Sequence, residues 1–130
     1  MGINQLKEIQ VSSLKRVKVN GGDVWYAIKK TDVNYLGFGE AYFSWVEYGT
    51  VKAWKKHKLM TMNLIVPVGR VKFVFFHEKK NKFQEEIIGE DNYIRLTVNP
   101  GLWYGFIGLS SSKSLVLNIS NILHDDRTYQ

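Results

Sequence analysis

Short segments in which apolar and polar residues alternate recur along the chain at roughly 8–12-residue spacing, a pattern typical of all-β proteins. Because successive side chains of a strand point to opposite faces, this alternation predicts strands with one buried face. Glycine and proline separate the segments, for example at Gly49, Gly69 and Pro100, and these residues favour turns. We therefore expect strands over residues 24–28, 40–47, 50–56, 62–67, 70–77, 92–98 and 114–119.

The segment from Arg70 to His77 begins as an alternation and ends as a continuous apolar run. It is typical of a strand with one face inside a barrel and the other against a second sheet or subunit. Residues 1–20 are expected to form an N-terminal arm or strand. Without a repeat or linker, residues 1–130 are predicted to form a single all-β domain, a jelly-roll β-barrel built from two Greek-key layers.

The composition fits a packed globular domain. The chain has 130 residues, of which 45% are hydrophobic and 14% aromatic, which excludes a disordered protein. It contains no cysteine, so disulfides and thiolate metal sites are excluded. Apolar runs such as Phe73–Phe76 are too short to span a membrane, and the start of the chain lacks the pattern of a secretion signal. We expect a cytoplasmic protein that does not bind membranes.

The net charge of +6 favours an anionic partner. The lysines and arginines are spread along the chain, and no nucleic-acid-binding motif accompanies them. Binding to DNA or RNA is therefore a weaker hypothesis than the two enzyme-related ones given below. A small anionic ligand such as a nucleoside diphosphate suits the charge equally well.

The segment between Gly49 and Gly69 contains the first candidate chemistry. Lys55 and His57 are two residues apart, a strand spacing that turns both side chains to the same face. Five residues separate Gly49 from Lys55, four separate His57 from Met62, and six separate Met62 from Gly69. This spacing resembles the first motif of cupins, and Pro100 to Tyr104 resembles their second motif.

The chain is more specifically similar to the dTDP-4-dehydrorhamnose 3,5-epimerase branch of the cupins, over residues 22–126. Five segments carry the resemblance in order: Gly22–Val24, Glu40–Ser44, Lys52–Lys55, Gly69–Lys79 and Asn99–Phe106. The resemblance implies a homodimeric cupin barrel that binds a nucleotide-linked keto-deoxysugar, with dTDP the expected nucleotide. It also implies isomerase or epimerase chemistry in surface polysaccharide synthesis, by metal-independent removal of a proton next to a carbonyl.

The resemblance assigns roles to individual residues. Lys55 stands where the family has its histidine base and is expected to act as base or as a clamp on the oxyanion. Tyr104 is the candidate general acid or hydrogen-bond donor. Lys52, His57 and His77 are the candidate substrate-binding residues, although His77 also suits a strand end in contact with a turn. No metal and no cofactor is expected, since Met62 and Tyr104 occupy positions where metal-binding cupins have better ligands.

Three departures from the family pattern leave a second hypothesis open. Lys55 replaces the histidine base, the family's tyrosine falls on Leu117, and its aspartate falls on His77. The second hypothesis is therefore a non-catalytic cupin that has kept the sugar or nucleotide pocket and lost the base. A lysine serves as base only where its surroundings lower its pKa.

Overall fold

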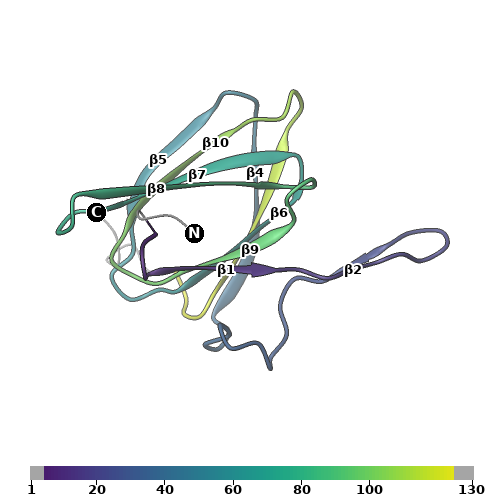
Figure 1. The fold of residues 1–130 in the computed structure, drawn as a ribbon, viewed down its shortest axis with the longest axis horizontal. Coiled ribbons are helices and arrows are strands. Elements are labelled where there is room, and N and C mark those ends of the chain that lie inside the picture. The colour runs from purple at the N-terminus through teal and green to yellow at the C-terminus, as the bar shows by residue number, and fades with distance from the viewer. Residues whose placement is uncertain (1–4, 125–130) are drawn as a thin grey trace.

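Two antiparallel sheets and a short hairpin make up the computed structural model, which describes residues 5–124 (Figure 1). The first sheet has five strands in the order β1-β9-β6-β11-β4, and the second has four in the order β5-β10-β7-β8. Within residues 5–124 there is no helix that could cross a membrane. The strands are β1 (Ile9–Ser13), β2 (Arg16–Val17), β3 (Val24–Trp25), β4 (Glu40–Val46), β5 (Val51–Lys56), β6 (Met62–Val68), β7 (Arg70–His77), β8 (Lys82–Gly89), β9 (Ile94–Val98), β10 (Trp103–Gly108) and β11 (Ser114–Ser120).

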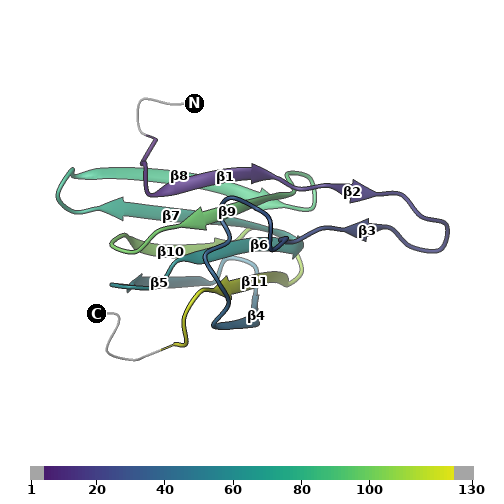
Figure 2. The same cartoon turned by 90° about the horizontal axis from the view of Figure 1, so that it is seen from below.

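The two sheets face each other and enclose the core, which confirms the predicted jelly-roll architecture. Their edges match: β8 and β1 lie on one side of the molecule, and β5 and β4 lie on the other (Figure 2). β4 and β5 are consecutive in the chain but belong to different sheets. The side of the barrel between them is therefore bounded by two edge strands.

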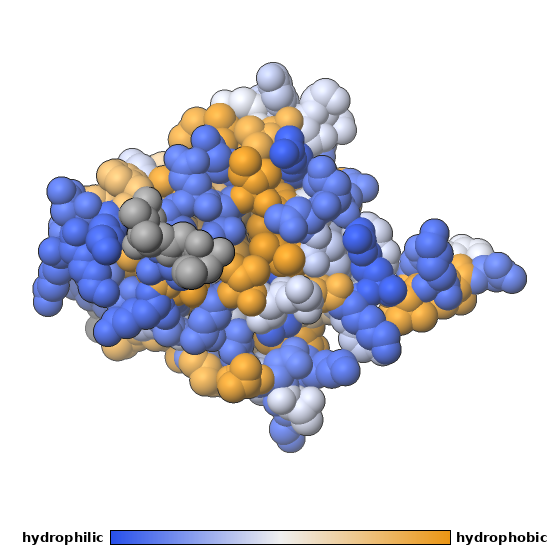
Figure 3. Space-filling model, viewed as in Figure 1, coloured by the Kyte–Doolittle hydropathy of each residue, from blue (hydrophilic) through white to orange (hydrophobic). Residues whose placement is uncertain are grey.

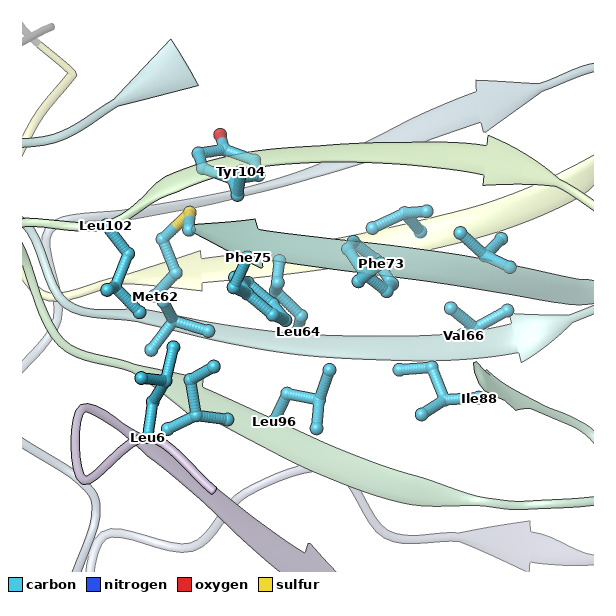
Figure 4. Close-up of a cluster of buried hydrophobic side chains, with 14 of the residues drawn as sticks. Leu6, Met62, Leu64, Val66, Phe73, Phe75, Ile88, Leu96, Leu102 and Tyr104 are labelled. Carbon is cyan, nitrogen blue, oxygen red and sulfur yellow. The ribbon is translucent and has the colours of Figure 1, made fainter. Parts of the chain in front are cut away.

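The core lies between the sheets and follows the alternation of the strands. On β7, Val71, Phe73 and Phe75 are fully buried while the intervening residues are only partly buried. They pack against inward side chains of β6 and β9, including Leu64 and Leu96 (Figure 4). Burial of such side chains stabilises the fold by about 1.5–3 kcal/mol each, which fixes the register of the strands.

A polar network holds the connection between β3 and β4 on the five-stranded sheet. The Asn63 Oδ1 atom accepts hydrogen bonds from Arg95 Nε at 3.0 Å and Thr97 Oγ1 at 2.6 Å. Arg95 also donates to the carbonyl of Ala27 at 2.8 Å and lies 3.4 Å from the Asp32 carboxylate. These buried polar groups are thus paired, as burial requires.

The β2–β3 hairpin projects beyond the two sheets (Figures 1 and 2). Arg16 anchors it by lying 4.9 Å from the centre of the Trp25 ring and donating to the Glu90 carbonyl at 2.7 Å. Val19 and Val24 are about half exposed on this hairpin. In the space-filling view, apolar residues appear along the hairpin and also as a band between hydrophilic flanks of the body (Figure 3).

The strand predictions differ from the structure in three places. Residues 24–28 form a strand only at β3, because its sole partner is the two-residue strand β2. β8 is missing from the prediction because its charged sequence shows little alternation; it pairs with β7 across a turn in which Asn81 has a φ of 51°. β10 is missing because Gly105 and Gly108 disfavour strands in isolation.

Candidate active site between the two sheets

A cavity of about 310 Å³ lies between the sheets, next to the edge strands β4 and β5. One side is apolar and the other carries hydroxyl, amide and ammonium groups. Among residues 5–124 no carboxylate lines it, so the charged side chains of the described lining are both cationic. The lining residues are Tyr42, Ser44, Lys52, Ala53, Lys55, Leu64, Phe73, Tyr104, Phe106, Val116 and Asn118.

The pairing of β5 with β10 places the two predicted catalytic residues side by side. Lys55 is the register partner of Tyr104, and both line the cavity. The register shifts between Tyr104 and Phe106, and Gly105 lies at this point. A Cβ on Gly105 would lie 2.6 Å from the Ala53 Cβ, so only glycine lets the two strands approach this closely.

His57 lies directly after β5 and contacts Tyr104 from within the protein. The Nε2 atom of His57 is 3.3 Å from the Tyr104 hydroxyl, and the two rings stack with their centres 5.8 Å apart. Their exposed fractions are only 4% and 6%. The Tyr104 hydroxyl points away from the cluster of apolar side chains (Figure 4). Tyr104 thus joins the cavity to a buried imidazole.

The surroundings of His57 keep its ring neutral at neutral pH. Burial, together with smaller contributions from the positive charges of His124 and Lys55, lowers the pKa of His57 to about 4. A neutral imidazole has one donor and one acceptor nitrogen, so its Nε2 can exchange a proton with the tyrosine hydroxyl in either direction, depending on the tautomer.

Lys52 bridges the edge strands beside the cavity. Its Nζ atom donates to the Trp45 carbonyl at 2.8 Å and to Ser44 Oγ at 3.4 Å, both on β4. The predicted substrate-binding residue Lys52 therefore lines the cavity and also connects β4 with β5. Its ammonium is a mobile point charge of the kind that binds phosphate without fixed geometry.

His77 lies apart from the other predicted site residues. It does not line the cavity; its Nε2 atom is 3.4 Å from the Glu8 carboxylate, and its Nδ1 accepts the backbone N–H of Lys80 at 3.2 Å. These contacts join the N-terminal segment to the end of β7 and to the turn that follows it. The substrate-binding role of His77 remains a prediction, without support from its position.

Sequence reasoning missed three polar residues of the cavity, Tyr42, Ser44 and Asn118. Asn118 on β11 is 5% exposed, and its Nδ2 atom donates to the Tyr42 hydroxyl at 3.2 Å. The strand alternates, so Val116 and Asn118 point into the cavity while Leu117 points away from it. The alternation of residues 114–119 could have identified Asn118, whereas placing the family tyrosine at Leu117 directed attention to the wrong face.

The apolar wall of the cavity comes from both sheets. Leu64 and Val116 belong to the five-stranded sheet, and Phe73 and Phe106 belong to the four-stranded sheet. The rings of Phe73 and Phe106 lie 5.2 Å apart, centre to centre. In residues 5–124, no three His, Asp or Glu side chains converge in a way that could hold a metal ion. The cavity therefore offers cations, hydroxyls and an apolar surface.

Comparison with solved structures gives matches over nearly the whole chain. A dTDP sugar isomerase from Desulfovibrio desulfuricans G20 is 32% identical, with 95% of this chain and 83% of that chain covered and a TM-score of 0.90. The sugar 3,4-ketoisomerase QdtA from Thermoanaerobacterium thermosaccharolyticum, solved in complex with TDP, is 16% identical, with coverages of 97% and 89% and a TM-score of 0.83.

An epimerase shares the same fold. The dTDP-6-deoxy-D-glucose-3,5-epimerase RmlC from Legionella pneumophila, solved with dTDP-4-keto-L-rhamnose, is 14% identical, with coverages of 96% and 72% and a TM-score of 0.84. No protein-family model matches the chain, and no curated protein matches it by sequence. The two structures with 16% and 14% identity show that the fold is shared, and the 32% identical isomerase is more closely related to this chain.

Proposed function

The chain belongs to the RmlC-like family of dTDP-sugar isomerases and epimerases, and we propose that it moves a proton next to the carbonyl of a dTDP-linked 4-keto-6-deoxy sugar. One observation carries this proposal. Lys55 and Tyr104 are register partners that line one cavity, and the neutral ring of His57 lies 3.3 Å behind the tyrosine hydroxyl. Together they supply a cation and a proton-transfer pair on one wall.

The charge of the cavity supports an anionic substrate. Two lysines, Lys52 and Lys55, line it, and no carboxylate of the described part of the chain opposes them. A diphosphate placed near these ammonium groups would gain charge-assisted hydrogen bonds. The apolar wall that includes Phe73 and Phe106 suits the C6 methyl group of a 6-deoxy sugar. An ordinary hexose carries a polar hydroxymethyl group at that position instead. The lining thus supports both halves of the proposed substrate.

The proposed reaction passes through an enolate. A base takes the proton from the carbon next to the carbonyl, the electron pair of the C–H bond moves to the carbonyl oxygen, and a proton then returns to carbon. Lys55 takes the proton if its amine is neutral, or stabilises the enolate oxygen if its amine is charged. When Lys55 is the base, Tyr104 donates the proton to carbon, and both groups are reset by exchange with solvent. When Lys55 is charged, Tyr104 first gives its hydroxyl proton to the neutral His57 across their 3.3 Å contact, and the resulting phenolate takes the substrate proton. Tyr104 then donates that proton to carbon and recovers its own from His57.

Deuterium exchange tests the proposal. dTDP-4-keto-6-deoxyglucose is incubated with the protein in deuterium oxide and followed by NMR. The proposal expects deuterium at C3 or C5, and a loss of about 10²-fold or more in the exchange rate for Tyr104→Phe. Lys58→Ala is the matched control, because Lys58 is an exposed lysine outside the cavity lining. No exchange with the unaltered protein would refute the proposed activity.

Two further variants separate the roles of Lys55. Lys55→Arg keeps the positive charge but removes a group that can act as a base. If exchange persists in Lys55→Arg and is lost in Lys55→Ala, the lysine acts as an oxyanion clamp. If both variants lose exchange while saturation-transfer contacts to the nucleotide remain, it acts as the base.

A second candidate function follows from the lysine at position 55. The residue stands where the resembling family has its histidine base, which favours a cupin that binds the sugar nucleotide without converting it. This candidate expects saturation-transfer contacts to the nucleotide with no deuterium in the sugar ring. The same NMR experiment therefore decides between the two candidates.

A further inference from the structure

A second hollow lies on the outer side of the five-stranded sheet, at the base of the β2–β3 hairpin. Its volume is about 230 Å³, and it shares no described lining residue with the cavity between the sheets. The lining comes from residues 12–15, 26–29 and 32–33 and from Arg95. Leu96, the next residue on β9, belongs to the core, so Arg95 projects from the opposite face of the sheet.

Arg95 is a buried cation with one nitrogen left for a ligand. The residue is only 3% exposed. Its Nε atom donates to Asn63, and its Nη1 atom donates to the Ala27 carbonyl and lies 3.4 Å from the Asp32 carboxylate. No hydrogen bond within residues 5–124 uses the Nη2 atom. Burial lowers the pKa of Arg95 although Asp32 opposes this, so the carboxylate offsets only part of the cost of burying the charge.

Two lysines from opposite flanks of the hairpin meet over one tyrosine ring of the lining. The Nζ atoms of Lys15 and Lys29 lie 5.9 Å and 5.2 Å from the centre of the Tyr26 ring. Neither lysine forms an ion pair with another described residue. With Arg95 and Asp32, the described lining carries three cationic side chains and one carboxylate, a net charge of +2. These like charges repel each other unless an anion lies between them.

We propose that this hollow binds a phosphate group, either as inorganic phosphate or as the phosphomonoester of a small molecule. A phosphomonoester carries a charge of roughly −1.5 to −2 at pH 7, which balances the lining, whereas a single carboxylate would leave it positive. Arg95 Nη2 offers a charge-assisted hydrogen bond, and Lys15 and Lys29 offer mobile point charges. The Ser12 hydroxyl accepts from Asn34 Nδ2 at 3.2 Å, so its own hydrogen can be donated to the anion.

The site goes beyond the proposed function and does not depend on it. A bound phosphate would connect three segments that are distant in sequence. These are β9 through Arg95, the start of the hairpin through Lys15, and the connection from β3 to β4 through Lys29. Because a ligand of the folded protein restrains the segments it joins, phosphate is expected to slow amide hydrogen exchange in residues 12–15 and 26–29.

NMR titration of the isotope-labelled full chain tests the proposal without any sugar nucleotide. Inorganic phosphate is added in one arm and glycerol 3-phosphate in another, with sodium chloride keeping the ionic strength constant. Both arms are expected to give saturable shifts in the amides of residues 12–15 and 26–29. Tighter binding of glycerol 3-phosphate would identify a phosphorylated small molecule as the ligand, and tighter binding of inorganic phosphate would identify the free ion.

Exposed lysines supply variants that leave the buried network intact. Lys15→Ala and Lys29→Ala are each expected to raise the phosphate dissociation constant about tenfold, as the loss of one charge-assisted hydrogen bond would. Lys30→Ala is the matched control, because Lys30 is the neighbouring exposed lysine outside the lining. Three results would each overturn the proposal: no saturable shift around the hollow, shifts confined to residues of the cavity between the sheets, or an equal loss of affinity in Lys30→Ala.

Discussion

The buried imidazole of His57 should make the stability of the protein fall with acidity in a defined pH window. Burial, with the positive charges of His124 and Lys55, lowers the pKa of His57 from 6.5 to about 4. The unfolded chain therefore binds more protons than the folded protein between these two values. The contribution of the neutral His57 ring to the free energy of unfolding is fully present above pH 6.5 and decreases as the pH falls toward 4.

The size of the effect follows from the two pKa values. For a histidine with a pKa of 6.5 unfolded and about 4 folded, the linkage relation gives a loss of about 2 kcal/mol between pH 7 and pH 5. This loss is a large share of the total stability of an ordinary domain, which is about 5–15 kcal/mol. His57 is only 4% exposed, so solvent does little to screen the effect.

Urea unfolding followed by tryptophan fluorescence at pH 5, 6, 7 and 8 measures the loss. The comparison variant is His57→Gln, which cannot titrate but retains a hydrogen-bonding side chain opposite Tyr104. The other two histidines are present in both proteins, so their contributions cancel in the difference. We expect the stability advantage of the unaltered protein over the variant to shrink by about 2 kcal/mol from pH 7 to pH 5. An advantage that stays constant with pH would refute the reasoning.

Three substitutions test the packing that surrounds the cavity, each by urea unfolding. Phe73→Ala removes a fully buried ring from the cavity wall and should cost about 3–5 kcal/mol. Gly105→Ala places a methyl group 2.6 Å from Ala53 and should cost about 1–3 kcal/mol, and the added change Ala53→Gly should recover most of it. Asn63→Leu leaves the buried Nε of Arg95 without its acceptor and should lower the free energy of unfolding by about 2–3 kcal/mol. A cost below about 0.5 kcal/mol would contradict this and show that Arg95 finds another acceptor.

Much of the barrel could be predicted because its strands alternate strongly. The prediction for residues 70–77 agrees with β7 at both ends, and the buried and partly buried positions of that strand follow its alternation. Gly49 and Gly69 have positive φ at the turns where the sequence placed them, as does Gly101, directly after Pro100. Local sequence carries this information, because turn geometry and strand period are properties of neighbouring residues.

The parts that were missed depend on distant residues. β8 forms because β7 provides a partner across the turn at Asn81, and β10 pairs with β5 because Gly105 lets the two strands approach closely. For the same reason, strand spacing singled out Lys55 and the resemblance singled out Tyr104, but neither could show that the two are register partners. His77 was included through the resemblance alone, and its contact with Glu8 follows from where the N-terminal segment packs.

The replacement of a histidine by Lys55 changes how the cavity can handle protons. A second imidazole at position 55 would provide a base near neutral pH, whereas a lysine has a different role in the proposed reaction in each of its two protonation states. A charged Lys55 can stabilise an enolate oxygen but cannot take a proton. With Lys55 in that form, proton transfer in the proposed reaction falls to Tyr104 and His57, which are the phenol and the neutral imidazole in contact at 3.3 Å. The low pKa of His57 is compatible with this role, because a neutral imidazole can accept the tyrosine proton and a charged one cannot.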